Sequence, residues 1–427
     1  MTVRTVRPAR VHGRIRAPPS KSYTHRALVA AFLAERPTEV IGPLDSDDTR
    51  ATRDGLRALG AQIRHSRAGW RVSPLKRRRR TPRAIVRCGE SGTTLRFLSA
   101  VAALGSAPVN FTGAPQLARR PMRELYGVLR TLGASVRHPS AAHALPCTIQ
   151  GPLSPGKVSI RGDVSSQFIS ALLMVLPTLP GPSRLRILGA TVSQPYVEAT
   201  CAVLDERGVR VRRTSGGFSI PGNQRYRTGR IRVPGDASSA AYLWAAAAAT
   251  GGHVEVEGVP SDLPQADLAI LPILSGMGAR VRRTSRFVSV AGPLSRPVSI
   301  DLTDSPDLVP LVSVLAALVP GGRSQLSGAP HLEFKESNRR VESVRLARAM
   351  GAKVSQFSSC IEIIGTDSPR SLKLPSLQDH RLVMSATVAG LAARRNSRVG
   401  RAEAVSKSYP GFWDALGALT QGGGTVR

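Results

Sequence analysis

Apolar and polar positions along this chain repeat in blocks of similar length. A leucine-rich segment leads into a glycine and then into an alternating apolar segment, as in residues 56–63 and again in 129–136. The glycines of the six copies, spaced 73, 75, 70, 73 and 72 residues apart, are Gly60, Gly133, Gly208, Gly278, Gly351 and Gly423. Each copy predicts the end of a helix, a glycine C-cap and an entering strand. We therefore expect an array of six supersecondary units, of which the last is the most degraded.

A second element repeats in the same register. An alternating Ile/Val segment leads into a polar loop, and the loop leads into a long apolar run. The six loops begin at Ser20, Gly89, Gly162, Gly235, Thr303 and Leu377. The runs at 168–176, 240–249 and 308–319 consist mostly of Ala, Leu and Val between turn signals, which predicts buried helices. None has the length needed to cross a bilayer, so we expect no membrane-spanning segment.

The length of 427 residues is enough for two or more domains with ample cores, and six units divide most simply into three plus three. The formal net charge is +32, carried by 53 arginines and only 7 lysines. A preference for Arg often reflects genome composition, but such a surface still attracts and steers anions. We expect no specific nucleic-acid partner. Non-specific binding of polyanions at low salt is expected, and added salt should weaken it steeply.

Basic and sulfur-containing residues add little to this picture. Residues 76–80 are either a nucleic-acid or targeting patch or a solvated loop between units, and we favour the loop because blocks of like charge usually stay exposed. Cys88, Cys147, Cys201 and Cys360 lack metal-ligand spacing, which is typical of small buried hydrophobes in a reducing compartment. The first residues have no apolar signal core, so the expected location is the cytoplasm.

Each unit places polar side chains where an apolar helix is expected to begin. Free backbone N–H groups and the positive end of the helix dipole make that position an anion site. Ser238, Ser239 and Asp304 are explained equally well as N-caps. Capping does not explain a further set of residues: Lys21, Arg26, Arg96, Gln167 and Arg381. Helix starts aligned in two facing domains predict a cleft that binds one or two strongly anionic ligands.

Two charged segments lie outside this period, and the first, residues 119–123, begins the expected helix of the second unit. Residues 331–339 precede an expected helix at 341–350. Within the segment, Lys335, Glu336 and Arg339 have the spacing of a surface ion-pair ladder, the usual role of such triplets on an exposed face. The chain has no Walker loop, no His-Glu-x-x-His, no Gly-x-Ser-x-Gly elbow and no Cys/His cluster, so we expect no metal site.

These residues make the chain resemble the 5-enolpyruvylshikimate-3-phosphate synthase family of enolpyruvyl transferases, from about Val11 to the C-terminus. The matching phrases, in chain order, are Pro19-Ser20-Lys21-Ser22 with Arg26, Gly92-Thr93 with Arg96, Arg120-Pro121, Val164-Ser165-Ser166-Gln167-Phe168, Ser193-Gln194-Pro195-Tyr196, Gly235-Asp236-Ala237-Ser238-Ser239, Lys335-Glu336-Ser337 with Arg339, Asp379-His380-Arg381 and Lys407. Each phrase alone is weak. All of them in order, in the appropriate units, are highly specific.

The resemblance implies an α/β fold of two domains, each built from three βαβαββ repeats with pseudo-threefold symmetry. The first domain is expected to combine residues 1–19 with 236–427, and the second to span 20–235. The active site is expected in the cleft between them. A monomer is expected.

The resemblance also implies a reaction. The enolpyruvyl group of phosphoenolpyruvate moves to the 5-hydroxyl of shikimate 3-phosphate and phosphate is released, by addition and elimination without metal or organic cofactor. The residues implied for phosphoenolpyruvate are Lys21, Gly92, Arg120, Gln167, Arg339, Arg381 and Lys407. Those implied for shikimate 3-phosphate are Lys21, Ser22, Arg26, Ser165, Ser166, Gln167, Ser193, Tyr196, Asp307, His331 and Lys335. Several cations suit a small ligand with a phosphate and a carboxylate, because Arg binds both bidentately.

The chemistry requires a base for the 5-hydroxyl and an acid for the methylene carbon. Asp307 is the expected base, working with Lys21. Glu336 is the expected acid, because a carboxyl that loses water when a site closes can hold a proton near neutral pH. His380 is expected to assist proton transfer.

Three positions depart from the family pattern. His331 stands where many members have Asn, which preserves a hydrogen-bonding group. Asn338 replaces an Asp, which makes the orientation of Arg339 less secure. Glu90 replaces an Asn and adds negative charge near the expected anion site.

Two rival functions were weighed. The UDP-N-acetylglucosamine enolpyruvyl transferases share the fold but carry a catalytic Cys in a mobile loop, and residues 114–120 contain none. A nucleic-acid-binding or RNA-end-processing protein would fit the charge, but the aromatic content is only 4% and no RRM, KH or OB signature occurs.

Overall fold

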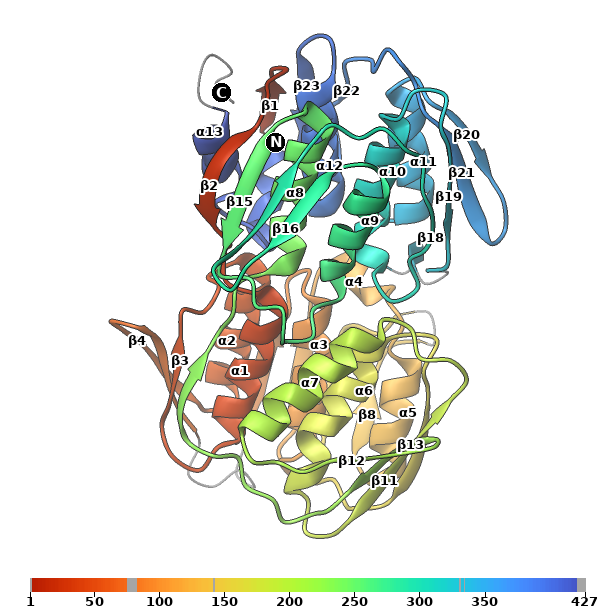
Figure 1. Ribbon diagram of the computed structural model, residues 1–427. Coiled ribbons are helices and arrows are strands. Elements are labelled where there is room, and N and C mark those ends of the chain that lie inside the picture. Colours follow the sequence, from red (N-terminus) through yellow and green to blue (C-terminus); the bar gives the residue numbers. More distant parts are fainter. Residues whose placement is uncertain (1, 75–82, 141–142, 330–331, 334, 421–427) are drawn as a thin grey trace. The chain divides into compact units, whose positions relative to one another are not determined.

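The computed structural model describes residues 2–74, 83–140, 143–329, 332–333 and 335–420 (Figure 1). His331, the basic run at 76–80 and Gly423 lie outside these residues. The chain forms two compact units. The terminal unit comprises Met1–Pro18 and Gly235–Arg427, and the central unit comprises Pro19–Pro234. Each crossing between units comes one residue before the expected one.

Three four-stranded sheets of one design build the described part of the central unit. Their strand orders are β14-β3-β5-β4, β6-β7-β9-β8 and β10-β11-β13-β12. The first two strands of each sheet are parallel and the other neighbours are antiparallel. The strands are β3 Thr38–Ile41, β4 Gln62–Ser66, β5 Gly69–Ser73, β6 Ala84–Arg87, β7 Val109–Thr112, β8 Ser135–Arg137, β9 Cys147–Gln150, β10 Lys157–Arg161, β11 Ser183–Leu188, β12 Arg212–Thr214, β13 Gly217–Ile220 and β14 Gly229–Arg232. The helices are α1 Lys21–Leu33, α2 Asp47–Ala58, α3 Gly92–Ala102, α4 Pro115–Ala118, α5 Arg123–Thr131, α6 Ser166–Val175, η2 Leu176–Thr178 and α7 Gln194–Glu206.

The terminal unit repeats this design twice and then departs from it. Two sheets have the orders β16-β17-β15-β2 and β18-β19-β21-β20, and a third has only three described strands, β1-β23-β22. In that third sheet β1 lies antiparallel to β23, in the place that a later strand takes in the other sheets. The strands are β1 Val3–Val6, β2 His12–Arg16, β15 His253–Glu257, β16 Arg280–Arg283, β17 Phe287–Ala291, β18 Ser299–Asp301, β19 Arg323–Ser327, β20 Lys353–Gln356, β21 Cys360–Ile364, β22 Lys373–Leu374 and β23 Ser397–Gly400. The helices are α8 Ala237–Thr250, η3 Ala266–Ala269, α9 Ile270–Gly276, η4 Pro306–Leu308, α10 Val309–Ala317, α11 Arg339–Ala349, α12 His380–Ala392, η6 Ala402–Lys407 and α13 Phe412–Leu419.

The chain passes between the two units directly after β2 and directly after β14. Strand β2 pairs in parallel with β15 of the terminal unit, but the chain continues from β2 into α1 of the central unit. Strand β14 pairs in parallel with β3 of the central unit, and the chain continues from β14 into α8 of the terminal unit. Each unit is therefore completed by a strand whose chain neighbour in the sequence belongs to the other unit.

The repeated glycines form the predicted helix ends. Gly60 follows α2 with φ +98°, a left-handed conformation that glycine adopts without steric cost. Its N–H donates to the carbonyl of Arg57, and the N–H of Ala61 donates to that of Leu56, which together form a Schellman motif. The same pair of bonds recurs at the four later glycines that the structure describes, which are Gly133, Gly208, Gly278 and Gly351. The prediction of a glycine C-cap followed by a strand is confirmed at these five positions.

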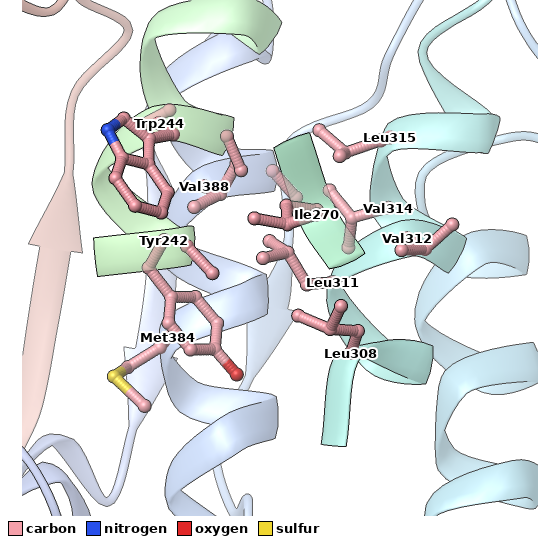
Figure 2. Packing of buried hydrophobic residues seen from close by; sticks show 14 of the residues in the cluster. Tyr242, Trp244, Ile270, Leu308, Leu311, Val312, Val314, Leu315, Met384 and Val388 are labelled. Atoms are coloured by element: carbon pink, nitrogen blue, oxygen red, sulfur yellow. The ribbon is translucent and has the colours of Figure 1, made fainter. Parts of the chain in front are cut away.

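The apolar runs form buried helices, as predicted. The run at 240–249 lies within α8, the run at 168–176 spans α6 and the start of η2, and the run at 308–319 begins in η4 and continues as α10. Helices α8, α10 and α12 pack on one another, and Figure 2 shows their apolar side chains meeting, with Trp244 and Tyr242 of α8 near Val388 of α12. A helix that is apolar on all sides suits this interior position. Across the described residues, every helix is too short or too polar to span a membrane.

Candidate active site

In the central unit, the starts of α1, α2, α3, α6 and α7, together with Arg120 between α4 and α5, carry the residues that we call the central cluster. Ser91 caps α3 by accepting a hydrogen bond from the N–H of Thr94, and Ser165 caps α6 by accepting from the N–H of Gln167. These caps leave other first-turn N–H groups at the positive end of each helix. The charged members of the cluster are Lys21, Arg26, Asp48, Arg96 and Arg120, and the other members are Ser22, Gly92, Ser165, Ser166, Gln167, Ser193 and Tyr196.

Gly92 brings two guanidinium groups close to the α3 backbone. A Cβ atom built on Gly92 would lie 2.8 Å from an Nη atom of Arg120 and 2.8 Å from an Nη atom of Arg96. Arg96 donates to the side-chain oxygen of Gln167 over 2.7 Å, and its guanidinium lies over the ring of Phe168. The absence of a side chain at Gly92 is therefore what admits both cations.

Lys21, the first residue of α1, forms an ion pair with Asp48 of α2. Its Nζ atom lies 3.0 Å from a carboxylate oxygen of Asp48. One turn further along α1, Nδ1 of His25 shares a 2.7 Å hydrogen bond with the Thr52 hydroxyl, which in turn bonds to Thr94 of α3. Burial, aided by Lys21, lowers the pKa of His25 to about 3 against the opposing effect of Asp48, so the ring is neutral. These bonds fix the starts of α1, α2 and α3 together.

Arg26 is buried, and most of its donors are used inside the unit. It donates to the Thr200 hydroxyl over 2.8 Å, to the carbonyl of Ser22 over 2.9 Å and to the carbonyl of Tyr196 over 2.7 Å. Burial lowers the pKa of Arg26 to about 10, a value at which the guanidinium is still charged at neutral pH. Arg26 thus ties α1 to α7 as well as adding positive charge to the cluster.

Ser193 precedes α7 in the left-handed conformation, with φ 54° and ψ 42°. This conformation is uncommon for a residue with a side chain, and such strained positions are frequent at binding sites. Ser193 is buried, as is Ser166 in the first turn of α6. Both hydroxyls belong to helix starts that converge on the central cluster.

In the terminal unit, a second group of charged side chains gathers around Arg339, at the start of α11. We call it the terminal cluster; its members are Asp267, Asp307, Lys335, Glu336, Arg339, Asp379, His380, Arg381 and Lys407. Arg339 is 1% exposed and donates to three carboxylates. Its bonds to Asp379, Asp307 and Glu336 measure 2.7, 2.6 and 2.7 Å. Although burial opposes the charged form, these carboxylates raise the pKa of Arg339 above its ordinary value.

Asp307 lies in η4 among three cations. An Nη atom of Arg381 lies 2.7 Å from one carboxylate oxygen, and Nη1 of Arg339 and Nζ of Lys335 lie 2.6 and 3.4 Å from the other. Burial raises the pKa of Asp307, but Arg381, Lys335 and Arg339 outweigh it and hold the pKa well below its usual range. The carboxylate is therefore ionised and only weakly basic in the ligand-free protein.

Glu336 lies between two cations. One of its oxygens accepts from Arg339, and the other is 3.7 Å from Nζ of Lys407, the last residue of η6. His380 begins α12, is buried, and has Nδ1 3.4 Å from Asp379. Both oxygens of Glu336 therefore face a cation, and a role as acid requires at least one of these cations to be engaged elsewhere.

The structure decides two alternatives that the sequence left open, and it moves the start of one expected helix. Ser238 and Ser239 do not cap α8, because the cap is Asp236, which accepts from the N–H of Ser239. The group at 335–339 is not an exposed ion-pair ladder, because Lys335 and Glu336 are partly buried and Arg339 fully buried. The helix that follows begins at Arg339 rather than at 341.

The departure at Asn338 has a structural explanation. Its side chain caps α11 by accepting from the N–H of Val341. Arg339 is oriented by Asp379, Asp307 and Glu336, so Asn338 does not make its position less secure.

Sequence reasoning gave no role to three buried carboxylates. Asp48 pairs with Lys21, Asp379 caps α12 and binds Arg339, and Asp267 approaches Arg381. An Asp directly before a predicted helix with cations in its first turn was a usable signal for Asp379. Asp267 lies in the short helix η3 and has no cation beside it in the sequence to serve as such a signal. Within the described part of the chain, no group of three or more His, Cys, Asp and Glu side chains is arranged to hold a metal ion.

Comparisons with known proteins point to one family. The family model of EPSP synthase (3-phosphoshikimate 1-carboxyvinyltransferase) matches residues 6–416. The chain is 37% identical over 410 residues to the 3-phosphoshikimate 1-carboxyvinyltransferase of Methanocorpusculum labreanum, covering 95% of each chain. It is 38% identical over 424 residues to that of Halobacterium salinarum, covering 97% of this chain and 98% of the relative.

Solved structures share the fold. The EPSP synthase of Acinetobacter baumannii matches with a TM-score of 0.80 at 24% identity, over 98% of both chains. The enolpyruvyl transferase NikO of Streptomyces tendae matches with a TM-score of 0.79 at 17% identity, over 100% of this chain and 98% of its own. With the fold, the order of the motifs and full-length relatives in agreement, the chain belongs to the EPSP synthase (3-phosphoshikimate 1-carboxyvinyltransferase) family.

Proposed function

We propose that this protein transfers the enolpyruvyl group of phosphoenolpyruvate to the 5-hydroxyl of shikimate 3-phosphate, releasing phosphate. The observation that carries the proposal is the terminal cluster, in which Asp307 and Glu336 share the buried cation Arg339. A base and an acid held on one cation suit a reaction that removes a proton from a hydroxyl and adds one to a carbon.

Phosphoenolpyruvate is bound by cations from both clusters. In the central cluster these are Lys21 and Arg120, with Gln167 and the backbone at Gly92. In the terminal cluster they are Arg339, Arg381 and Lys407. Its phosphate and carboxylate need several donors at once, and guanidinium groups meet both in bidentate fashion. The closeness of Arg120 to the Gly92 backbone supports a shared anion position there.

Shikimate 3-phosphate is bound by hydroxyl groups and cations. The residues from the central cluster are Lys21, Ser22, Arg26, Ser165, Ser166, Gln167, Ser193 and Tyr196, and those from the terminal unit are Asp307, His331 and Lys335. Hydroxyls at the starts of α6 and α7 stand where helix dipoles favour a phosphate. Lys335, 3.4 Å from Asp307, would bring the sugar-like ring to the base.

Substrate binding prepares the carboxylates for proton transfer. The anionic groups of phosphoenolpyruvate compete for Arg339 and Arg381, which hold Asp307 in the free protein. When they turn to the substrate, Asp307 loses cationic partners and its basicity rises. Lys407 and Arg339 leave Glu336 by the same exchange, which favours its protonated form.

The proposed addition and elimination steps balance in atoms and protons. Working with Lys21, Asp307 takes the proton of the 5-hydroxyl as the hydroxyl oxygen bonds to the central carbon of phosphoenolpyruvate, and Glu336 gives a proton to the methylene carbon. In the tetrahedral intermediate, the bond to the phosphate oxygen breaks while the new methyl group returns a proton to Glu336. The proton held by Asp307 leaves with the phosphate. His380, buried beside Asp379, assists this proton transfer. These steps use neither a metal nor an organic cofactor.

The protein is proposed to act as a monomer in the cytoplasm. Its net charge of +32 also supports non-specific binding of polyanions at low salt, without a specific nucleic-acid partner.

The decisive experiment is phosphate release from the purified protein with phosphoenolpyruvate and shikimate 3-phosphate together, compared with each substrate alone. Release only with both supports the proposal. Release with UDP-N-acetylglucosamine in place of shikimate 3-phosphate, or no release with either acceptor, would overturn it.

A further inference from the structure

Arg381 lies between two carboxylates rather than one. One of its Nη atoms is 2.7 Å from Asp307, and the other is 3.5 Å from Asp267 of η3. Asp267 is 1% exposed, it is linked to the proposed base Asp307 through the shared guanidinium of Arg381, and none of the proposed proton-transfer steps uses it. The mechanism above therefore leaves this buried carboxylate without a role.

The surroundings of Asp267 hold it firmly in place. The Ser238 hydroxyl in the first turn of α8 donates to the carboxylate oxygen that also faces Arg381. Gln265, just before η3, accepts from the N–H of Ala237 and donates to the carbonyl of Gly235. The short η3 segment is thus tied to the start of α8, and Asp267 is fixed relative to Arg381 of α12.

Resting on the proposed function, we propose that Asp267 is a positioning residue for the transfer reaction, which shares the Arg381 guanidinium with Asp307 and so prevents Arg381 from pairing with Asp307 alone. With both carboxylates present, Arg381 is divided between them and can be drawn to an incoming anion. Without the charge on Asp267, Arg381 pairs with Asp307 alone. It then stays paired when substrate arrives and keeps Asp307 a weak base.

The protonation state of Asp267 makes this arrangement sensitive to pH. Burial raises the pKa of Asp267 to about 6, and the nearby carboxylates Asp307 and Asp236 act in the same direction. Arg381 and the Ser238 hydroxyl oppose the rise. The second carboxylate oxygen is buried and has no hydrogen-bond partner among the described residues, which adds to the cost of the charged form.

The groups that face Asp267 come from three elements. Arg381 comes from α12, Asp307 from η4, Ser238 and the buried Tyr242 from α8, and Asp236 is the N-cap directly before α8. Asp307 stays ionised well below pH 6, because its pKa is held far below the usual range. Between about pH 5 and pH 8, Asp267 is therefore the carboxylate of this pair that changes charge.

The test compares the pH dependence of kcat and of kcat/KM for phosphoenolpyruvate in the wild type and in Asp267→Asn. The variant keeps the size of the side chain and resembles the protonated carboxyl in charge. We expect it to lower kcat roughly tenfold at pH 7.5, the effect of about one pKa unit on the base. We also expect the KM for shikimate 3-phosphate to change little, and kcat to fall less on going from pH 8 to pH 5 than it does in the wild type.

Ionisation of the substrate phosphates near pH 6 contributes equally to both proteins. The difference between the two profiles therefore isolates Asp267. Asp262→Asn, an exposed carboxyl five residues earlier, is the matched control and should leave both profiles unchanged. Equal kcat values and equal acid limbs in Asp267→Asn and the wild type would overturn the proposal.

A second variant covers the case in which Asp267→Asn does not fold. Ser238→Ala removes the hydroxyl bond that lowers the pKa of Asp267, so the acid limb should move to higher pH. If the fall of kcat on the acid side of the pH profile stays at the same pH in a folded Ser238→Ala protein, this would count against the proposal. A wild type that releases no phosphate with both substrates would instead overturn the proposed function itself.

Discussion

The two clusters contain similar cations but very different numbers of carboxylates. The central cluster has four cations and, as defined above, one carboxylate, Asp48, which pairs with Lys21. The terminal cluster has four cations and four carboxylates, interlocked around Arg339 and Arg381. An excess of positive charge beside helix starts suits the holding of phosphates. A balanced network suits groups whose protonation must change during the reaction. We infer that the central cluster binds phosphate groups, whereas the cations of the terminal cluster exchange their carboxylate partners for substrate.

Removing the proposed base should have the largest effect. Asp307→Asn keeps the shape of the side chain but cannot take the proton of the 5-hydroxyl, so we expect kcat to fall by roughly 10²- to 10⁴-fold. Phosphate release under saturating substrates measures this. Asp301→Asn, at the end of β18, is an exposed control that should retain normal turnover. Near-normal kcat in Asp307→Asn would remove this residue from the mechanism and erase the proposed contrast between the clusters.

The interlocking of the terminal cluster should also appear in stability. Asp379→Ala deprives the buried Arg339 of its fully buried partner and removes the cap of α12, so we expect a loss of roughly 3–5 kcal/mol in the free energy of unfolding. Asp48→Ala breaks a pair whose lysine is 18% exposed, and should cost only about 1 kcal/mol. Urea unfolding followed by circular dichroism compares the two. Equal losses would show that the networks do not differ as proposed.

A methyl group at Gly92 should disturb binding in the central cluster and leave the chemistry largely intact. In Gly92→Ala the new Cβ would meet the guanidinium groups of Arg120 and Arg96, which must move away. We expect the KM for phosphoenolpyruvate to rise roughly 10- to 100-fold, as a misplaced binding group can cause. Gly127→Ala in α5, where an added Cβ meets nothing within 4 Å, is the control and should leave KM unchanged. A large fall in kcat with constant KM would argue against a binding role.

The smallest effect is expected at Ser193. Ser193→Gly relieves the left-handed backbone and should stabilise the protein by about 1 kcal/mol. The same change removes a hydroxyl proposed to bind shikimate 3-phosphate, so the KM for that substrate should rise several-fold. Asn223→Gly, at φ 56° on an exposed turn, should give a similar gain in thermal stability without affecting KM. If both variants leave KM unchanged, Ser193 does not contact the substrate.

Local patterns predicted much of this fold. The glycine at each helix end needs only its left-handed conformation and two nearby carbonyls, so Gly60 and its counterparts could be recognised from sequence. Apolar runs such as 240–249 were long enough to identify as buried helices. The place of β1 beside β23 could not be predicted in this way, because that pairing joins residues near opposite ends of the chain.

The sequence predicted site residues that belong to a motif, but not residues that only packing brings together. Arg339 was identified from its phrase, but its bonds to Asp379 and Asp307 join segments that are 40 and 32 positions away in the sequence. Asp267 has an ordinary sequence context and gains its importance only because η3 folds against α8 and α12. A buried carboxylate in a short helix, without a neighbouring cation in sequence, gives no local signal.

The position of β2 and β14 at the two crossings between units has a consequence for folding during synthesis. During synthesis β1 and β2 leave the ribosome first, but their partners β23 and β15 follow only after the whole of residues 19–234 has been made. Because domains generally fold as units during synthesis, the central unit can gather its strands while the earliest segment still waits for a sheet to join. Strands β1 and β2 are therefore made before the central unit but join their sheets only after it.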